Sequence, residues 1–251
     1  MMEIFLLGTG TAVPVKQHSP AGLAVIADGM QLLFDIGPGT LSRLVQTGIS
    51  YEHIDRLFLT HFHPDHTLDL ATLLLVFNYA PGASRTRPFT ITSCAGIEDF
   101  LQRMYQLYPD IIPLNYELQL HSVRREEFLL GNLKIRTVPT GHTPESVAYR
   151  LEVAGRSMVY SGDATPQGEL AQLSDGADLL ICECSFPAGW ETEDHLTADS
   201  VSRIAEEARV KSLVITHCYP PALDIDLIGQ IRSHYSGEVQ LAMDGLHLTL
   251  S

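Results

Sequence analysis

A dense group of metal-ligand side chains lies between Leu59 and His66. It consists of His61, His63, Asp65 and His66. Imidazole nitrogens and carboxylate oxygens are the usual ligands of zinc and similar divalent ions in sites without thiolates. Four such side chains so close together are hard to explain as separate surface or hydrogen-bonding residues. The sequence therefore predicts a metal site here.

Pro64 sets the backbone conformation of this segment. A proline disfavours helical geometry in the residue before it and blocks a helix running through it, so His63 is expected to be extended. Side chains two positions apart on an extended segment point the same way. We therefore expect His61, His63 and Asp65 to converge from one side of a loop, with His66 following as the chain turns into a helix.

Three further ligand-type residues follow apolar runs typical of strands. They are His142, Asp163 and His217, and the runs end at residues 138, 160 and 215. Loops that leave such strands commonly carry functional side chains. An isolated Asp at a strand end more often forms a turn. Together with the first group, however, these residues predict a centre for two metal ions that share one carboxylate.

The remaining patterns predict α and β layers packed face to face in one domain over residues 1–251, because early strands lie close together and later strands alternate with helices. Thr197 is predicted to cap a helix. Strands are predicted at 3–7, 22–27, 31–34, 56–59, 89–92, 116–120, 133–138, 147–151, 157–160, 179–182, 212–215, 239–242 and 247–250. Helices are predicted at 40–46, 69–79, 97–107, 168–173, 198–208 and 224–234.

Composition narrows the class of protein further. The chain has 251 residues, 45% of them hydrophobic, enough for one large buried core. The opening segment lacks a signal-peptide pattern and no apolar run is long enough to cross a bilayer, so we expect a cytoplasmic protein without membrane contact. The net charge of −14 disfavours a surface that coats nucleic acid.

The four cysteines lack the spacing of a structural zinc site and are expected in the core; they are Cys94, Cys182, Cys184 and Cys218. The loop at 81–88 is expected to be solvated, in preference to a substrate or dimer contact.

Ordered motifs along nearly the whole chain resemble those of the metallo-β-lactamase fold superfamily, and most closely its ribonuclease Z-like branch. The central motif is His-x-His-x-Asp-His at residues 61–66. The others are Leu-Gly-Thr-Gly-Thr-Ala-Val-Pro at 7–14, Phe-Asp-Ile-Gly-Pro-Gly at 34–39, Cys-Glu-Cys-Ser-Phe at 182–186, His-Leu-Thr-Ala-Asp at 195–199 and Leu-Val-Ile-Thr-His at 213–217.

The resemblance implies an α+β fold, a four-layer αββα sandwich with the site at one edge of two sheets. It implies one metal on His61, His63 and His142, and a second on Asp65, His66 and His217, with Asp163 as the bridge. It also implies that Asp35 orients the ligands, and that His195, with Glu183 beside it, assists the leaving group. Asp65 is expected to orient or deprotonate the nucleophile as well as bind metal.

Two departures from the ribonuclease Z-like pattern concern the substrate. Enzymes that mature tRNA usually carry a long arm, in many bacterial members between the positions of His142 and Asp163, but here two short strands fill this interval. Pro38 also replaces an acidic residue of the related motif. We therefore expect a phosphodiesterase that acts on a small phosphodiester or another RNA, and not one specialised for tRNA.

The expected chemistry is hydrolysis by a hydroxide shared between two divalent ions. The nitrogen and oxygen ligands suit zinc, and manganese or iron would also fit. The same hydroxide could attack a thioester, a lactone or a sulfate ester, so these substrates remain alternatives. A metal-dependent binding protein without catalysis is a further alternative. The apolar segment at 68–80 and the loop after it could form a homodimer contact.

Overall fold

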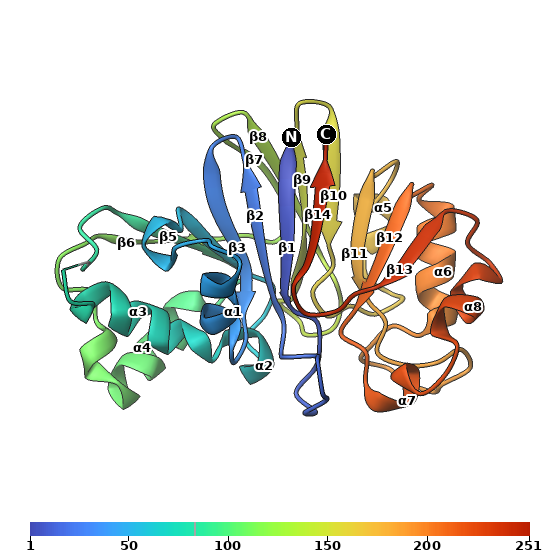
Figure 1. Ribbon diagram of the computed structural model, residues 1–251, viewed down its shortest axis with the longest axis horizontal. Coiled ribbons are helices and arrows are strands. Elements are labelled where there is room, and N and C mark those ends of the chain that lie inside the picture. The colour runs from blue at the N-terminus through green and yellow to red at the C-terminus, as the bar shows by residue number, and fades with distance from the viewer. Residues whose placement is uncertain (83) are drawn as a thin grey trace.

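The computed structural model describes residues 1–82 and 84–251. Two seven-stranded sheets lie face to face, and helices cover both outer faces (Figure 1). The first sheet has the spatial order β14 (Leu246–Leu250), β1 (Met2–Gly8), β2 (Gly22–Ala27), β3 (Met30–Ile36), β4 (Arg56–Leu59), β5 (Phe89–Ser93), β6 (Leu118–Ser122). The second has the order β13 (Glu238–Leu241), β12 (Ser212–Thr216), β11 (Leu179–Glu183), β10 (Arg156–Tyr160), β9 (Val147–Val153), β8 (Leu133–Pro139), β7 (Glu126–Leu130).

Successive side chains along each strand point to opposite faces of the sheet, and this alternation produces the layers. Phe34 and Phe58 point between the two sheets, while their neighbours Leu33 and Leu57 point outward under helices. The first sheet is covered by α1 (Thr40–Gln46), α3 (Asp69–Tyr79) and α4 (Ile97–Leu107), and the second by α5 (Leu170–Leu173), α6 (Ala198–Glu207) and α8 (Leu227–Arg232). These faces confirm the predicted αββα arrangement.

Strand direction brings the loops of interest to one edge. Strands β3 to β6 are parallel, as are β10 to β13, whereas β9 is antiparallel to both of its neighbours, so that β8 runs in the same direction as β10. The carboxyl ends of β4, β8, β10 and β12 therefore lie at the same end of the molecule. Parallel α/β layers place binding sites at such ends.

Several elements differ from the sequence prediction. Strand β7 and the one-turn helices α2 (Pro64–Thr67) and α7 (Pro220–Leu223) were not expected, nor were the 3-10 helices η1 (Tyr51–His53) and η2 (Pro109–Ile111). One-turn helices are too short to show a helical period, and β7 is an edge strand with alternate residues half-exposed. The predicted helix at 224–234 shortens to α8. Thr197 caps α6 as predicted, in a capping box with Ser200.

The loop after α3 packs more closely against the rest of the protein than expected. The Arg85 side chain is buried, lies over the rings of Phe77 and Phe89, and donates to the carbonyls of Glu52, Arg87 and Pro88. The prediction of a solvated loop was therefore wrong for this residue, while residue 83 lies outside the described part of the chain.

One expectation from composition is met by the cysteines. All four cysteines are buried and unpaired, as predicted. Among the described residues, no helix has the length and apolar character needed to cross a bilayer.

Candidate metal centre

The seven predicted ligand residues come from loops of both sheets and meet at one edge. His61 and His63 follow β4, whereas His142, Asp163 and His217 follow β8, β10 and β12. Backbone hydrogen bonds tie these loops together across the two sheets: Val147 N donates to the Thr60 carbonyl at 3.0 Å, and His217 N donates to the Thr9 carbonyl at 2.8 Å. The site is therefore built into the junction of the sheets.

Glycines allow the close backbone approach that this junction requires. A Cβ on Gly162, which has φ +55°, would lie 2.6 Å from the Thr60 side chain. A Cβ on Gly37 would lie 2.0 Å from the Asp65 carbonyl oxygen. Such distances exclude any larger residue without displacement of the neighbouring loop.

The segment around Pro64 is partly as predicted. His63 is extended, with φ −61° and ψ 148°, but Pro64 then begins α2, so Asp65 and His66 lie in a helical turn. The expectation that Asp65 would converge with His61 and His63 from one extended loop is therefore wrong. The turn directs Asp65 and His66 to the opposite side of the centre, toward His217.

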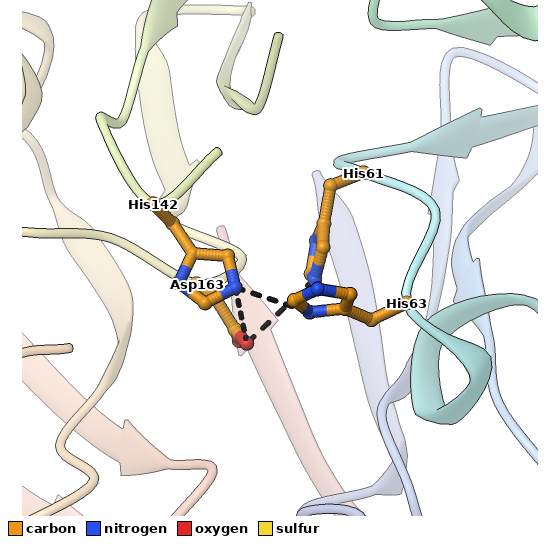
Figure 2. Close-up of side chains that lie close together, drawn as sticks. All are labelled: His61, His63, His142 and Asp163. Carbon is orange, nitrogen blue, oxygen red and sulfur yellow. Dashed lines mark hydrogen bonds and ion pairs between the residues drawn. The ribbon is translucent and has the colours of Figure 1, made fainter. Parts of the chain in front are cut away.

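One group of ligand atoms comprises His61, His63, His142 and Asp163, whose side chains point toward one another (Figure 2). His142 Nε2 lies 3.1 Å from His63 Nδ1. Oδ2 of Asp163 lies 3.7 Å from His61 Nε2 and 3.6 Å from His142 Nε2. Ligands about 2.0–2.1 Å from a tetrahedral zinc would be about 3.4 Å apart, so these spacings fit one ion.

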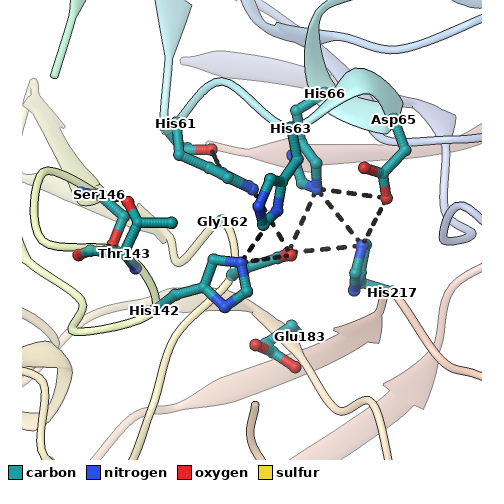
Figure 3. A network of polar contacts seen from close by, with 12 residues as sticks. His61, His63, Asp65, His66, His142, Thr143, Ser146, Gly162, Glu183 and His217 are labelled. Carbon is teal, nitrogen blue, oxygen red and sulfur yellow. Dashed lines mark hydrogen bonds and ion pairs between the residues drawn. The ribbon is translucent and has the colours of Figure 1, made fainter. Parts of the chain in front are cut away.

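A second group comprises Asp65, His66 and His217, whose side chains point toward one another (Figure 3). His66 Nε2 and His217 Nε2 are 3.3 Å apart, and His217 Nε2 is 3.4 Å from Asp65 Oδ2. Oδ1 of Asp163 lies 3.3 Å from His66 Nε2 and 3.4 Å from His217 Nε2. The two carboxylate oxygens of Asp163 therefore face different groups, as a bridging ligand requires.

Unsatisfied polar atoms also fit a metal site. His61 Nε2 and Asp163 Oδ1 are buried without a hydrogen-bond partner, and such atoms are rare unless something binds them. Burial, with the charge of His66, holds the pKa of His61 well below its usual value, so this imidazole is neutral. Burial alone would raise the pKa of Asp163, but His217 and His66 hold it well below the usual range. A buried carboxylate among imidazoles is a suitable ligand set for a divalent cation.

Asp35 holds His66 from behind. Its Oδ2 accepts from His66 Nδ1 at 2.8 Å and from the Tyr160 hydroxyl at 2.9 Å, and its Oδ1 accepts from Thr60 N at 2.9 Å. Asp35 is fully buried. The hydrogen bond leaves His66 Nε2 free and pointed inward, which is the usual role of a carboxylate behind a metal-bound imidazole.

Three of the other imidazoles, those of His61, His142 and His217, have outer partners that the sequence did not identify. His61 Nδ1 lies 3.0 Å from Thr60 Oγ1, and His142 Nδ1 lies 2.6 Å from the Asp194 carbonyl. His217 Nδ1 lies 3.4 Å from Ser185 Oγ. Thr60 directly precedes the motif at 61–66, and Ser185 lies within the motif at 182–186. Their positions in or next to these motifs were the only indication in the sequence of a contact with the imidazoles.

Backbone strain accompanies the site. Asp35 has φ 51° and His217 has φ 52°, in the left-handed region that non-glycine residues seldom adopt. Strain of this kind persists where surrounding contacts fix the residue and is common at functional sites. In His217 it is fixed by the backbone bond to Thr9.

His195 lies beside both groups of candidate ligands, with its ring 4.8 Å from that of His142, and is held by Glu183. His195 Nδ1 is 3.0 Å from Glu183 Oε1, and its ring lies 5.8 Å from that of His217. Burial alone would lower the pKa of His195, but the Glu183 hydrogen bond and charge raise it to about 9. Glu183 is fully buried and also accepts from Ala164 N and Ser185 Oγ. It therefore positions His195 and the loop beside Asp163, and its oxygens are occupied.

The fold and this constellation define a metallo-β-lactamase fold with a ribonuclease Z-like site. The metallo-β-lactamase fold protein YhfI from Bacillus subtilis is 25% identical, with a TM-score of 0.84 over 98% of each chain. The human tRNase Z short form, ELAC1, is 23% identical, with a TM-score of 0.80 over 99% of each chain. The Ribonuclease Z of Haloarcula marismortui is 26% identical over 98% of this chain and 96% of its own length.

A family model described as Anti-Pycsar protein Apyc1 matches residues 2–226. The chain belongs to this family. The predicted superfamily and the predicted ribonuclease Z-like relationship are confirmed by these matches together.

Proposed function

We propose that the protein is a phosphodiesterase that uses two divalent metal ions, with zinc as the preferred metal. The observation that carries this proposal is the Asp163 carboxylate. Its Oδ2 faces His61 and His142, and its Oδ1 faces His66 and His217. A single closed structural site would not need a carboxylate shared between two groups of imidazoles.

In this proposal His61, His63 and His142 hold one ion, and Asp65, His66 and His217 hold the other, with Asp163 between them. When bound, such ions lower the pKa of water and offset charge on a phosphoryl group. Asp65 has one oxygen directed to His217, and it is placed to orient the attacking water. The imidazoles fix the geometry because Asp35, Thr60, Ser185 and Asp194 hold their outer nitrogens.

His195 supplies the proton to the departing alkoxide. Glu183 binds His195 Nδ1, so the other ring nitrogen is the one available to a substrate. A histidine raised to a pKa of about 9 by Glu183 is protonated at neutral pH, as a general acid must be. Glu183 is a positioning residue in this scheme.

Three observations support a small phosphodiester over tRNA. The interval from His142 to Asp163 is taken up by the hairpin of β9 and β10, without an added arm. The exposed residues Glu191, Glu193 and Asp194 lie just before His195 and disfavour a long polyanion. The net charge of −14 acts in the same direction.

The test combines metal analysis with a substrate panel. We expect two equivalents of divalent metal per chain, and hydrolysis of bis(p-nitrophenyl) phosphate in preference to a thioester, a lactone or a tRNA precursor. Asp163→Asn should lose both ions, whereas Asp175→Asn, an exposed carboxylate away from the site, should retain them. Loaded protein without activity on any phosphodiester would overturn the proposal.

We also propose a homodimer in a cytoplasmic setting. Large apolar side chains are exposed along α3 and α4, including Leu68, Leu75 and Leu107, and they line a groove of about 650 Å³. An exposed apolar surface of this kind favours self-association. Sedimentation of wild type and of Leu75→Asp tests it, and a monomeric wild type would exclude it. The unpaired cysteines favour a reducing compartment.

A further inference from the structure

Three aromatic rings form a parallel row beside the metal centre. The ring of Phe186 lies 5.2 Å from that of Trp190, with 3° between their planes. On its other side Phe186 lies 5.2 Å from the ring of Tyr219, with 8° between planes. Phe186 and Trp190 follow β11, whereas Tyr219 follows β12, so the row is assembled from two loops. We call Tyr219, Phe186 and Trp190 the aromatic row.

The inner end of the row contacts the catalytic histidine. The ring of His195 lies 5.8 Å from that of Tyr219 and 6.1 Å from that of Phe186. Tyr219 also lies 6.1 Å from the ring of His217. His195 therefore lies beside both the candidate metal ligands and the inner end of the aromatic row.

The outer end of the row is open and fixed in place. Trp190 is 47% exposed, so its ring is not required by the core. The loop that carries it is held by Ala188 N, which donates to Gln230 Oε1, and by Gly189 N, which donates to Asp199 Oδ2, both at 2.8 Å. An exposed indole on a loop anchored to α6 and α8 is prepared for binding without further ordering.

We propose that the aromatic row, with Trp190 at its outer end, stacks a planar aromatic group carried by the leaving alcohol of the substrate, as a nucleobase is carried by a nucleoside. This inference rests on the proposed function. The leaving group must be within reach of His195, and the row extends from His195 away from the metal ligands. Aromatic side chains bind nucleobases through their faces with little dependence on sequence. The neighbouring Glu191 and Glu193 repel further phosphates but do not oppose a neutral base.

Fluorescence gives a direct test, because Trp190 is the sole tryptophan of the chain. The probe is the phosphorothioate analogue of a dinucleoside monophosphate, which resists hydrolysis, added to metal-loaded protein. Dimethyl phosphate is the control without bases. We expect saturable quenching of the indole emission by the dinucleoside analogue and none by dimethyl phosphate. Equal emission at saturating analogue, with binding shown by calorimetry, would overturn the inference.

Kinetics of variants give a second readout. For Trp190→Ala we expect KM for a dinucleoside monophosphate to rise about tenfold relative to KM for a nucleoside methyl phosphate cleaved at its methyl ester. Trp190→Phe should restore most of the difference because a flat ring is kept. Leu129→Ala, an exposed apolar residue on β7, is the matched surface control. An equal effect of Trp190→Ala on both substrates would contradict a role in stacking.

The two hypotheses fail in different ways. If the metal-loaded protein hydrolysed no phosphodiester, the proposed function would be wrong. A protein that is active on phosphodiesters, but whose Trp190 emission and KM ratio do not respond to the base, would remove the inference about the aromatic row alone.

Discussion

At the metal centre, each buried imidazole presents one nitrogen inward and is held through the other. Asp35 holds His66, Thr60 holds His61 and Ser185 holds His217. This arrangement fixes ring orientation before any ion binds, and outer partners of this kind commonly change metal affinity 10–100-fold when they are removed. The chemistry of the site thus depends on these outer partners as well as on the candidate ligands.

The proposed role of His195 predicts a dependence on the leaving group. His195→Ala should lower kcat by a factor of roughly 10² for a substrate with an alkyl leaving group, because such an alkoxide needs a proton. The loss should be small for a p-nitrophenolate leaving group, which departs without one. Turnover on both substrates, with metal content as a check, measures this contrast.

His53→Ala is the matched control, since His53 is exposed on η1 and does not belong to the group of candidate ligands. Unchanged turnover of His195→Ala on the alkyl substrate would exclude His195 as the acid.

That the candidate ligands gather in one place was predictable from the sequence, and their hydrogen-bond partners were not. His142, Asp163 and His217 were identified because each follows an apolar strand, and such loops gather at one edge. The bonds from Tyr160 and Thr60 to Asp35 join strands far apart in the chain. A hydroxyl on a strand gives no indication of which distant carboxylate it will meet.

Among the elements, the loops that leave the strands control the site. The loop after β10 passes so close to Thr60 that Gly162 cannot carry a side chain without displacement. Gly162→Ala should therefore lower the free energy of unfolding by a large amount. The loss should exceed the cost of about 1–2 kcal/mol for placing a non-glycine residue in the left-handed conformation. It should also weaken metal binding, because Asp163 is the next residue. Thermal unfolding and a metal titration measure the two effects.

Gly155→Ala is the matched control, because Gly155 also has a positive φ, +74°, but nothing lies within 4 Å of an added Cβ. It should cost about 1 kcal/mol and leave metal affinity unchanged. Equal losses in the two variants would mean that the contact with Thr60 does not matter.

Strand β11 begins beside a carboxylate that should make stability depend on pH. Asp178 is buried, accepts from Ser157 N at 2.8 Å and pairs with Lys211 Nζ at 2.7 Å. Burial alone would raise the pKa of Asp178, but Lys211 and Ser157 lower it overall. A carboxylate with a lowered folded pKa stabilises the protein above its unfolded pKa of about 3.9, and that stability is lost as the pH falls through the folded value.

Asp178→Asn should therefore cost about 1–3 kcal/mol at pH 7, and the difference from wild type should shrink as the pH falls below about 4. Denaturant unfolding at several pH values measures this. Asp175→Asn is the control, because its pair with Arg209 is exposed and such pairs contribute little. A difference that does not change with pH would contradict the assignment.

Long elements with clear periods were predicted well, whereas short ones were not. Helices α1, α3 and α4 begin and end at the predicted residues, because their apolar spacing spans two or more turns. Helix α2 is a single turn, so its effect on Asp65 could not be foreseen. Arg85 was placed in solvent because the local sequence does not show that its side chain will reach the distant carbonyl of Glu52.

Across the whole molecule, the ligands join the two sheets. His61 and His66 extend from the first sheet, while His142, Asp163 and His217 extend from the second. Bound ions would therefore oppose separation of the sheets, and removal of metal by a chelator should lower the midpoint of thermal unfolding. Metal at 100 times its Kd adds about 2.7 kcal/mol if the unfolded chain does not bind it.

Calorimetry of loaded and chelated protein measures this, and addition of zinc, manganese or iron then compares the metals. Asp163→Asn should show no difference between the two conditions. If wild type unfolded at the same temperature with and without metal, ions would not link the sheets.

Strand β14 pairs with β1 and forms the edge of the first sheet, although the two strands are far apart in the sequence (Figure 1). The turn before β14 is also tied to the start of the chain, because Asp244 accepts from Thr9 N and Ser19 N. Thr9 in turn holds His217 through its carbonyl. On the ribosome, a nascent chain would therefore expose the edge of β1 until β14 leaves the exit tunnel. We expect newly made chains to depend on chaperones until this pairing has formed, because an open strand edge is prone to aggregate.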